Sequence, residues 1–208
     1  MNRKSKKNTK GVALSFFSIV FGLTALQINA QALYVFGGDS KAEACFENAR
    51  IASKISPGNR SMLEPCDYAL DYSSLNLKDR AATFSNKGII LMSLGKYPES
   101  LMNHEKAVTL QPERPEIYVN RGNSYFFNRD YIMALDDYET ARGLNVPQLH
   151  FVHFNMGLVL ERMGKNQQAE AEYLEALEIE PGWDIAVNRL AFLREKMAEK
   201  KLTNENEE

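Results

Sequence analysis

Three asparagines recur at almost equal spacing after residue 80, and their side chains could bind a polypeptide. They are Asn86, Asn120 and Asn155, which lie 34 and 35 residues apart. A primary amide carries both a donor and an acceptor, so it can pair with the backbone of a peptide of any sequence. An extended peptide rises about 3.3 Å per residue, so a row of amides would meet it every few residues. The alternative is that these amides only satisfy neighbouring backbone groups or water.

Other residues capable of chemistry are few. The two cysteines, Cys45 and Cys66, do not have the Cys-x-x-Cys spacing of a redox pair. His150 and His153 are three residues apart, but no further zinc ligand is close in sequence. There is no Gly-x-Ser-x-Gly, phosphate-binding loop or His-Glu-x-x-His motif, and no carboxylate pair that can be placed together. We therefore expect no catalytic activity, cofactor or metal, and histidines such as His104 that pack in the interior.

The overall composition is that of an ordinary globular protein. The chain has 208 residues, of which 44% are hydrophobic and 25% charged, and its formal net charge is −2. These values exclude a disordered, collagen-like or polytopic membrane protein. A net charge near zero gives no indication of a nucleic-acid partner.

The charge is unevenly distributed, because the first residues resemble a secretory signal peptide. Residues 1–11 contain five cations and no acid, and residues 12–26 are uncharged and mostly apolar. Ala30 and Ala32 then provide small residues for a cleavage site. We predict a signal peptide over residues 1–32, cleaved after Ala30 or Ala32.

The alternative is an uncleaved membrane anchor. Gln27, Asn29 and Gln31 interrupt the apolar run, which is shorter than the ~20 residues of a membrane span. In either case we expect an exported chain, most simply in the periplasm. Removing five cations from the 25 leaves 20 against 27 acidic residues, a net charge of −7. That balance argues further against nucleic acid and against anionic membrane surfaces.

Several columns of residues repeat with a period of about 34. Each column keeps one side-chain type: glycine, small, aromatic or histidine, and alanine. The columns are Gly88, Gly122 and Gly157; Ser100, Ala134 and Ala169; His104, Tyr138 and Tyr173; and Ala107, Ala141 and Ala176. Internal self-similarity at this period indicates a repeat architecture.

The pattern resembles the tetratricopeptide repeat family. Three units match it: unit 1 (81–114), unit 2 (115–148) and unit 3 (150–183), with Leu149 as an insert. The resemblance implies an all-α fold, a right-handed α-solenoid of stacked antiparallel helix pairs. The glycine and small columns would let the two helices of a unit approach closely. No unit buries its apolar face alone, so neighbours must stack.

The remaining segments are expected to cap the stack. Residues 184–201 predict a capping helix, and residues 202–208 an acidic disordered tail. At the other end, residues 33–39 form an extension, and residues 40–75 resemble a degenerate fourth helix pair.

The resemblance also implies a disulfide. Aligning Ala49 and Ala69 with the family's eighth and twenty-seventh positions places Cys45 at the fourth and Cys66 at the twenty-fourth. Those positions face each other in an antiparallel pair whose eighth and twentieth positions meet. Oxidising compartments favour such bonds. A bond from Cys45 to Cys66 would close a loop of about 22 residues and contribute roughly 3 kcal/mol.

The family's concave side is lined by fixed positions of each first helix. The resemblance therefore predicts a peptide-binding groove lined by Asn86, Ile89, Met92, Asn120, Asn123, Phe126, Phe127, Phe154, Asn155, Leu158 and Arg162. The last helix would add Ile185, Asn188, Arg189 and Phe192 if it stacks in register. Phe126, Phe127 and Phe154 could instead be core between units.

The partner is expected to be another protein. Members of the family that read acidic C-terminal tails carry lysine at the fifth position, where this chain has Ser85, Val119 and Phe154. An apolar or mixed extended segment therefore fits better. We expect an exported, non-catalytic adaptor of the cell envelope; the alternatives are an assembly subunit of a stable complex and, less favoured, an enzyme. The oligomeric state is left open.

Overall fold

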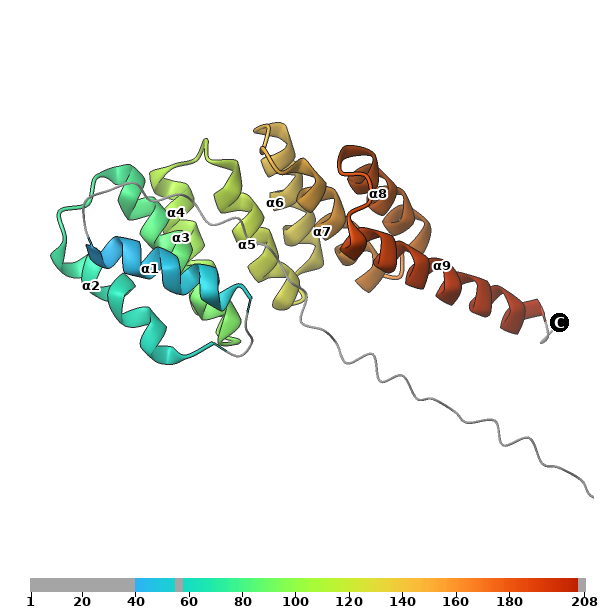
Figure 1. Ribbon diagram of the computed structural model, residues 1–208, viewed down its shortest axis with the longest axis horizontal. Coiled ribbons are helices and arrows are strands. Elements are labelled where there is room, and N and C mark those ends of the chain that lie inside the picture. Colours follow the sequence, from blue (N-terminus) through green and yellow to red (C-terminus); the bar gives the residue numbers. More distant parts are fainter. Residues whose placement is uncertain (1–39, 55–57, 206–208) are drawn as a thin grey trace, which may run out of the picture.

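The computed structural model describes residues 40–54 and 58–205. The expected signal peptide and the extension over 33–39 lie outside these residues. Within the described ranges the chain is helical and has no strand (Figure 1). The helices are α1 (Ser40–Ala52), α2 (Glu64–Tyr72), α3 (Leu77–Ser93), α4 (Tyr97–Leu110), α5 (Pro115–Phe127), α6 (Tyr131–Gly143), α7 (Leu149–Arg162), α8 (Asn166–Ile179) and α9 (Asp184–Glu205), with a short 3-10 helix, η1 (Arg60–Leu63), before α2.

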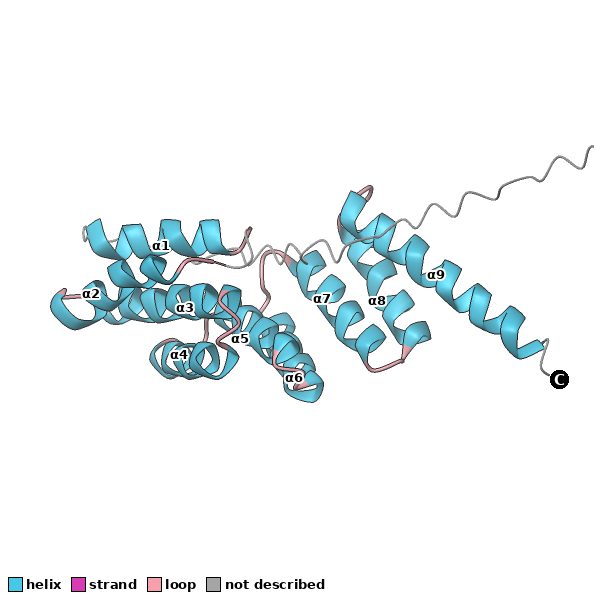
Figure 2. Cartoon of the chain, turned by 90° about the horizontal axis from the view of Figure 1, so that it is seen from below, coloured by secondary structure: helices cyan, strands magenta, loops and turns pink. Residues whose placement is uncertain are grey.

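The helices form consecutive antiparallel pairs that stack side by side. The pairs are α1 with α2, α3 with α4, α5 with α6, and α7 with α8, and each pair contacts the next. Figure 2 shows α1, α3 and α4 in successive layers at the N-terminal end, and α9 following α8 at the other end. The prediction of an all-α solenoid is confirmed. No helix in the described part of the chain is long and apolar enough to cross a bilayer.

One close approach sets the geometry of each unit. A Cβ atom added to Gly88 would lie 2.6 Å from the His104 ring, and one added to Gly122 would lie 2.7 Å from the Tyr138 ring. In unit 3 the corresponding distance, from Gly157 to the Tyr173 ring, is 2.5 Å. These distances are too short for any side chain, so only glycine lets the ring of the second helix lie against the backbone of the first.

The C-terminal helix caps the stack through one apolar face. Ala186, Leu190 and Leu193 of α9 are buried with the core of units 2 and 3. The helix continues to Glu205, beyond the predicted end at residue 201. The predicted tail therefore begins too early, because residues 202–205 contain no glycine or proline that would end a helix.

The first pair is joined by a disulfide between Cys45 and Cys66, with Cα atoms 4.7 Å apart. Both cysteines are fully buried, in a cluster with Ala49 of α1 and Ile89 and Ile90 of α3. The bond thus links α1 to α2 at the surface that both present to unit 1.

The turn inside each unit requires a left-handed residue at the same place. Gly95 and Gly164 have φ angles of 72° and 76°, whereas unit 2 uses Arg129 with φ of 68°. The following amide N–H closes the turn onto the carbonyl five residues earlier, as from Asp130 to Tyr125 at 2.9 Å. The left-handed conformation is unfavourable for arginine, and glycine adopts it freely.

We therefore expect Arg129→Gly to raise the free energy of unfolding by about 1 kcal/mol. Urea unfolding followed by circular dichroism measures this change. Arg129→Ala is the control, because alanine keeps the backbone strain; a gain from alanine equal to that from glycine would contradict the backbone explanation.

Removing the disulfide should destabilise the protein. We expect Cys45→Ala with Cys66→Ala to lower the free energy of unfolding by about 3 kcal/mol, because the bond restricts the unfolded chain. Alkylation followed by mass spectrometry should label both cysteines of the purified wild type only after reduction. Labelling without reductant under denaturing conditions would show that the bond is absent.

Candidate peptide-binding surface

Most residues of the predicted groove lie inside the stack. Of the eleven, Phe127 is half-buried and Arg162 is exposed, whereas the other nine are less than 10% exposed. Asn86 and Asn120 are almost completely buried, at 0% and 1%, and Asn155 is 7% exposed. In this conformation these nine side chains are closed to a ligand. The first helices approach so closely that positions expected on an open concave face become contacts between units.

The asparagines form hydrogen bonds between consecutive units. Asn120 Nδ2 donates to Ser85 Oγ of unit 1 at 3.1 Å, and Asn155 Nδ2 donates to Asn123 Oδ1 of unit 2 at 3.1 Å. The Tyr138 hydroxyl also donates to Asn123 Oδ1, at 2.7 Å. For Asn120 and Asn155 the structure therefore favours the internal role over the peptide ladder. Asn86 differs, because neither atom of its amide has a hydrogen-bond partner.

The phenylalanines belong largely to the core. Phe154 packs against the rings of Tyr173 and Trp183, with centroids 5.4 and 4.9 Å away. Phe126 packs against Phe127, with centroids 5.3 Å apart, and is 6% exposed. These ring contacts lie within units 2 and 3 and leave little surface for an external segment.

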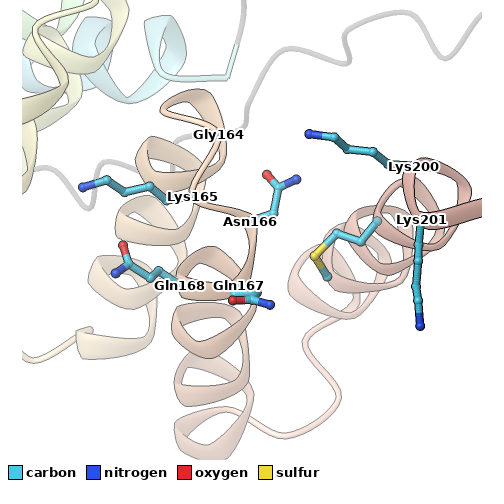
Figure 3. A pocket seen from close by; sticks show the side chains of 8 residues that line it. Gly164, Lys165, Asn166, Gln167, Gln168, Lys200 and Lys201 are labelled. Carbon is cyan, nitrogen blue, oxygen red and sulfur yellow. The ribbon is translucent and has the colours of Figure 1, made fainter. Parts of the chain in front are cut away.

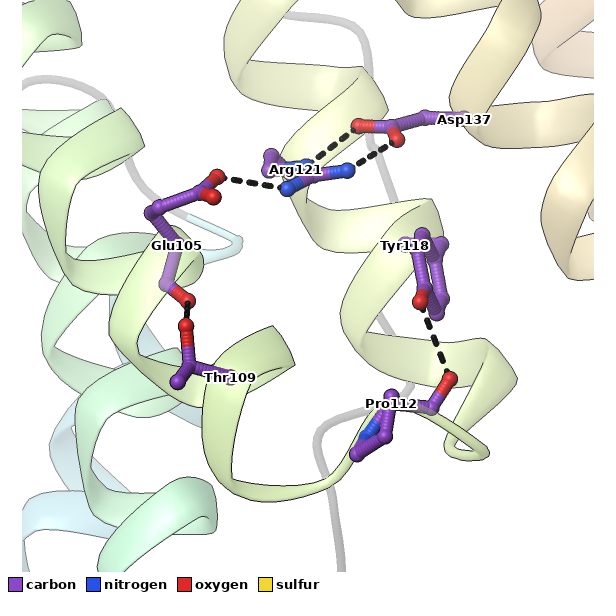
Figure 4. A network of polar contacts seen from close by, with 6 residues as sticks. All are labelled: Glu105, Thr109, Pro112, Tyr118, Arg121 and Asp137. Atoms are coloured by element: carbon purple, nitrogen blue, oxygen red, sulfur yellow. Dashed lines mark hydrogen bonds and ion pairs between the residues drawn. The ribbon is translucent and has the colours of Figure 1, made fainter.

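An arginine joins units 1 and 2, and the sequence analysis did not identify it (Figure 4). Arg121 of α5 donates two hydrogen bonds to Asp137 of α6, at 2.8 and 2.7 Å, and pairs with Glu105 of α4 at 2.6 Å. The bonds to Asp137 raise the pKa of Arg121. Burial raises the pKa of Asp137, while Arg121 acts in the opposite direction. A bidentate pair of this kind fixes helix orientation as well as distance.

A similar ion pair joins unit 1 to the α1–α2 pair. Lys87 of α3 pairs with Asp67 of α2 at 2.5 Å. Lys87 and Arg121 lie 34 residues apart, each one residue before the column glycine. That recurrence is the sequence signal that would have revealed the joints. In unit 3 the same position is Met156, whose side chain cannot form an ion pair.

A second buried carboxylate holds the capping helix. Glu161 of α7 is 8% exposed and accepts two hydrogen bonds from Arg189 of α9, at 2.9 and 2.8 Å. The Tyr173 hydroxyl donates to the same carboxylate at 3.1 Å. A paired buried carboxylate is costly to unpair, so Arg189 fixes the position of α9 against α7.

Where α9 lies against α7, part of the predicted groove remains accessible. Arg162 of α7 is exposed, with its guanidinium 5.7 Å from the centre of the Phe126 ring. On α9, Ile185 is 36% and Phe192 48% exposed, and the Arg189 guanidinium lies 5.4 Å from the Phe192 ring. We call Arg162, Ile185, Asn188, Arg189 and Phe192 the C-terminal surface.

Comparison with known proteins identifies the repeats in two segments of the chain. One family model, described as a TPR repeat, matches residues 88–128, and a second, described as a tetratricopeptide repeat, matches residues 150–183. The chain therefore contains tetratricopeptide repeats in these two segments. It is 32% identical to human tetratricopeptide repeat protein 13 over 99 residues, and 26% identical to human RNA polymerase II-associated protein 3 over 121 residues. These matches cover 48% and 58% of this chain but only 11% and 18% of the relatives.

Another relative is matched over more of its own length, and two solved structures share the fold. Photosystem I assembly protein Ycf3 of Synechococcus elongatus is 29% identical over 130 residues, which cover 58% of this chain and 75% of Ycf3. The first tetratricopeptide domain of RPAP3, solved with the HSP90 peptide SRMEEVD, superposes with a TM-score of 0.54 at 26% identity, covering 58% of this chain and 98% of that domain. The crystal structure of MamA has a TM-score of 0.58 at 20% identity, covering 80% and 87%, and shows a shared fold.

An open pocket of about 640 Å³ lies between the α7–α8 turn and the end of α9 of the tetratricopeptide stack (Figure 3). Its charged lining residues are Lys165, Lys200 and Lys201, and its amide-bearing ones are Asn166, Gln167 and Gln168. The pocket therefore adds cationic surface at the edge of the last tetratricopeptide unit. Among the described residues, no three His, Cys, Asp or Glu side chains are grouped to hold a metal ion.

The histidine of the first tetratricopeptide unit is enclosed without polar partners. His104 is fully buried, and neither ring nitrogen has a hydrogen-bond partner. Burial, with a smaller contribution from Arg121, lowers the pKa of His104 from 6.5 to about 3. The unfolded chain consequently binds a proton at His104 between these pH values and the folded chain does not. This difference in proton binding costs no stability above pH 6.5 and an increasing amount as the pH falls toward 3.

We expect His104→Phe to remove this dependence. Relative to the variant, the wild type should lose about 1.4 kcal/mol of unfolding free energy per pH unit as the pH falls below about 6. Urea unfolding of both proteins at pH 7, 6, 5 and 4 measures the difference. Parallel stability profiles over this range would contradict the assignment.

Proposed function

We propose that this tetratricopeptide-repeat protein is an exported, non-catalytic adaptor that binds an extended segment of another protein at its C-terminal surface. The observation that carries the proposal is the accessibility of this surface: Arg162, Ile185 and Phe192 are exposed, whereas nine of the eleven predicted groove residues are buried. An aromatic side chain beside guanidinium groups is a common composition for binding hot spots.

The chemistry of the surface favours a segment with both apolar and acidic side chains. Phe192 and Ile185 offer apolar contact, while Arg162 and Arg189 carry positive charge around the single buried carboxylate of Glu161. Lys196 also lies 3.9 Å from that carboxylate. The surface therefore has an excess of positive charge, opposite in sign to the whole chain.

The comparison with RPAP3 supports a peptide ligand, because its first domain is solved with the peptide SRMEEVD. The family resemblance implies lysine at the fifth position for members that read acidic C-terminal tails, and this chain has Ser85, Val119 and Phe154 there. We therefore do not extend the chaperone peptide itself to this protein. Export is supported by the signal-like sequence over 1–32 and by the Cys45–Cys66 disulfide, which suits an oxidising compartment such as the periplasm.

Site-specific photo-crosslinking in the native cell tests the binding surface. A photoreactive residue replacing Asn188 on α9 should give a discrete protein adduct, and the same residue replacing Ile132, which is 65% exposed on α6, should not. Adding Arg162→Ala and Phe192→Ala should reduce the Asn188 adduct at least about tenfold, as loss of a hot-spot contact implies.

Both substituted side chains are on the surface, so the purified double variant should keep the wild-type circular-dichroism spectrum. That measurement controls for folding. An adduct that persists in the double variant, or one formed equally from position 132, would contradict this site. A partner that copurifies in fixed stoichiometry would instead favour an assembly subunit.

A further inference from the structure

The junction between the α1–α2 pair and unit 1 leaves a buried amide unpaired. Asn120 and Asn155 each donate to a polar side chain of the preceding unit. Asn86 occupies the same column, is 0% exposed, and has no partner for Nδ2 or for Oδ1. The asparagine hydrogen bond that joins unit 2 to unit 1 and unit 3 to unit 2 is therefore absent at the first junction.

The cause lies in the side chains that the first pair presents. Cys45, Ala49, Ala52, Leu63 and Cys66 pack against α3, and none of them offers a strong hydrogen-bonding group. Asn86 lies on the covered face, because the carbonyl oxygen of Thr83, one turn before it, is 3.8 Å from Cys45 Sγ, and Ile90, one turn after it, joins the same cluster. A buried unpaired amide weakens such a junction by a factor of roughly 5 to 150.

The first pair is built to stay folded when it separates. Helices as short as α1 and α2, with 13 and 9 residues, are not stable alone. The disulfide holds them together without attaching them to α3. Three polar contacts join the first pair to α3: Lys87 pairs with Asp67, Arg80 donates to the Leu70 carbonyl at 3.2 Å, and the Gly58 N–H donates to the Ser93 carbonyl at 3.4 Å. Residues 73–76 connect α2 directly to α3, so separation would break the Gly58 contact and pivot at this connection, with α1 moving furthest.

We propose that the disulfide-bonded α1–α2 pair is a displaceable cover over a binding site on α3. The site takes an extended polypeptide segment, whose backbone N–H and C=O groups pair with the Asn86 amide while its side chains contact Ile89 and Ile90. This ligand class rests on the proposed adaptor function. The displacement itself rests only on the unpaired amide and the small side chains of the contact.

Thiol labelling of the full chain measures the displacement. Ile90→Cys places a reactive group beneath the cover, and Ile117→Cys is the matched control, since both isoleucines are fully buried. Ile117 of α5 packs against Ala81 and Ala107 of unit 1, so it becomes accessible only if the junction between units 1 and 2 opens. With a maleimide under native conditions, the Ile90→Cys variant should react at least tenfold faster than the Ile117→Cys variant. Equal labelling rates of the two variants would contradict the proposal that the α1–α2 pair is displaced from α3.

Two further changes, each combined with Ile90→Cys, identify the cause. Asn86→Leu should slow labelling at position 90 about tenfold, because it removes the unpaired amide. A tether made by Gly58→Cys with Ser93→Cys should slow it to the rate of the Ile117→Cys control. A Cβ atom at residue 58 would lie 3.6 Å from the Cβ of residue 93, within the range of disulfides. Faster labelling with Asn86→Leu would contradict the role of the amide.

A displayed library of random heptapeptides tests the ligand. Selected peptides should bind the wild type and lose at least tenfold affinity for the oxidised tether, with peptide mapping to verify that Cys45–Cys66 is intact. Peptides insensitive to the tether but lost in Phe192→Ala would support the C-terminal surface and overturn the covered site. Absence of any tether-sensitive peptide would likewise overturn it.

Discussion

The contact of an aromatic or imidazole ring with a glycine backbone is the constraint on which each unit depends. Any Cβ atom at Gly88, Gly122 or Gly157 would collide with the ring of the second helix. This approach brings the two helices together, and close stacking of the units then buries the residues of the first helices. The same tight packing that makes the stack stable closes most of its concave positions to ligands.

Buried polar groups then determine how well each junction fits. Units 2 and 3 place Tyr138 and Tyr173 over their glycines, and each hydroxyl reaches an acceptor, Asn123 or Glu161. Unit 1 has Ile89 and Met92 at the equivalent positions, which offer no acceptor for a tyrosine hydroxyl. His104 is the smaller ring that fits over Gly88 there, although its nitrogens remain unpaired. Unit 1 is consequently the least well satisfied part of the described stack.

The sequence predicts the features that repeat along the chain. It does not predict the features that depend on which side chains of different helices face each other. The glycine, alanine and aromatic columns predicted the helix pairs, and their register placed Cys45 opposite Cys66, where the structure has a disulfide. The burial of Asn120 could not be predicted, because it depends on Ser85 in the preceding unit and on the distance between two helices. Arg121 was overlooked because its partners, Glu105 and Asp137, lie in two different helices.

The terminal helices at the two ends of the stack are attached in different ways. At the C-terminal end, α9 supplies Arg189 to a buried carboxylate, so the capping helix is fixed by a charged pair and its outer row is free for contact. At the N-terminal end, the covalent bond lies within the capping pair, and the junction with α3 combines mostly small apolar side chains and a few polar contacts with an unpaired amide. A disulfide preserves the fold of the pair but contributes nothing to its attachment. Stability of the cap and strength of its attachment are thus separate properties in this protein, and only the first is secured by the cysteines.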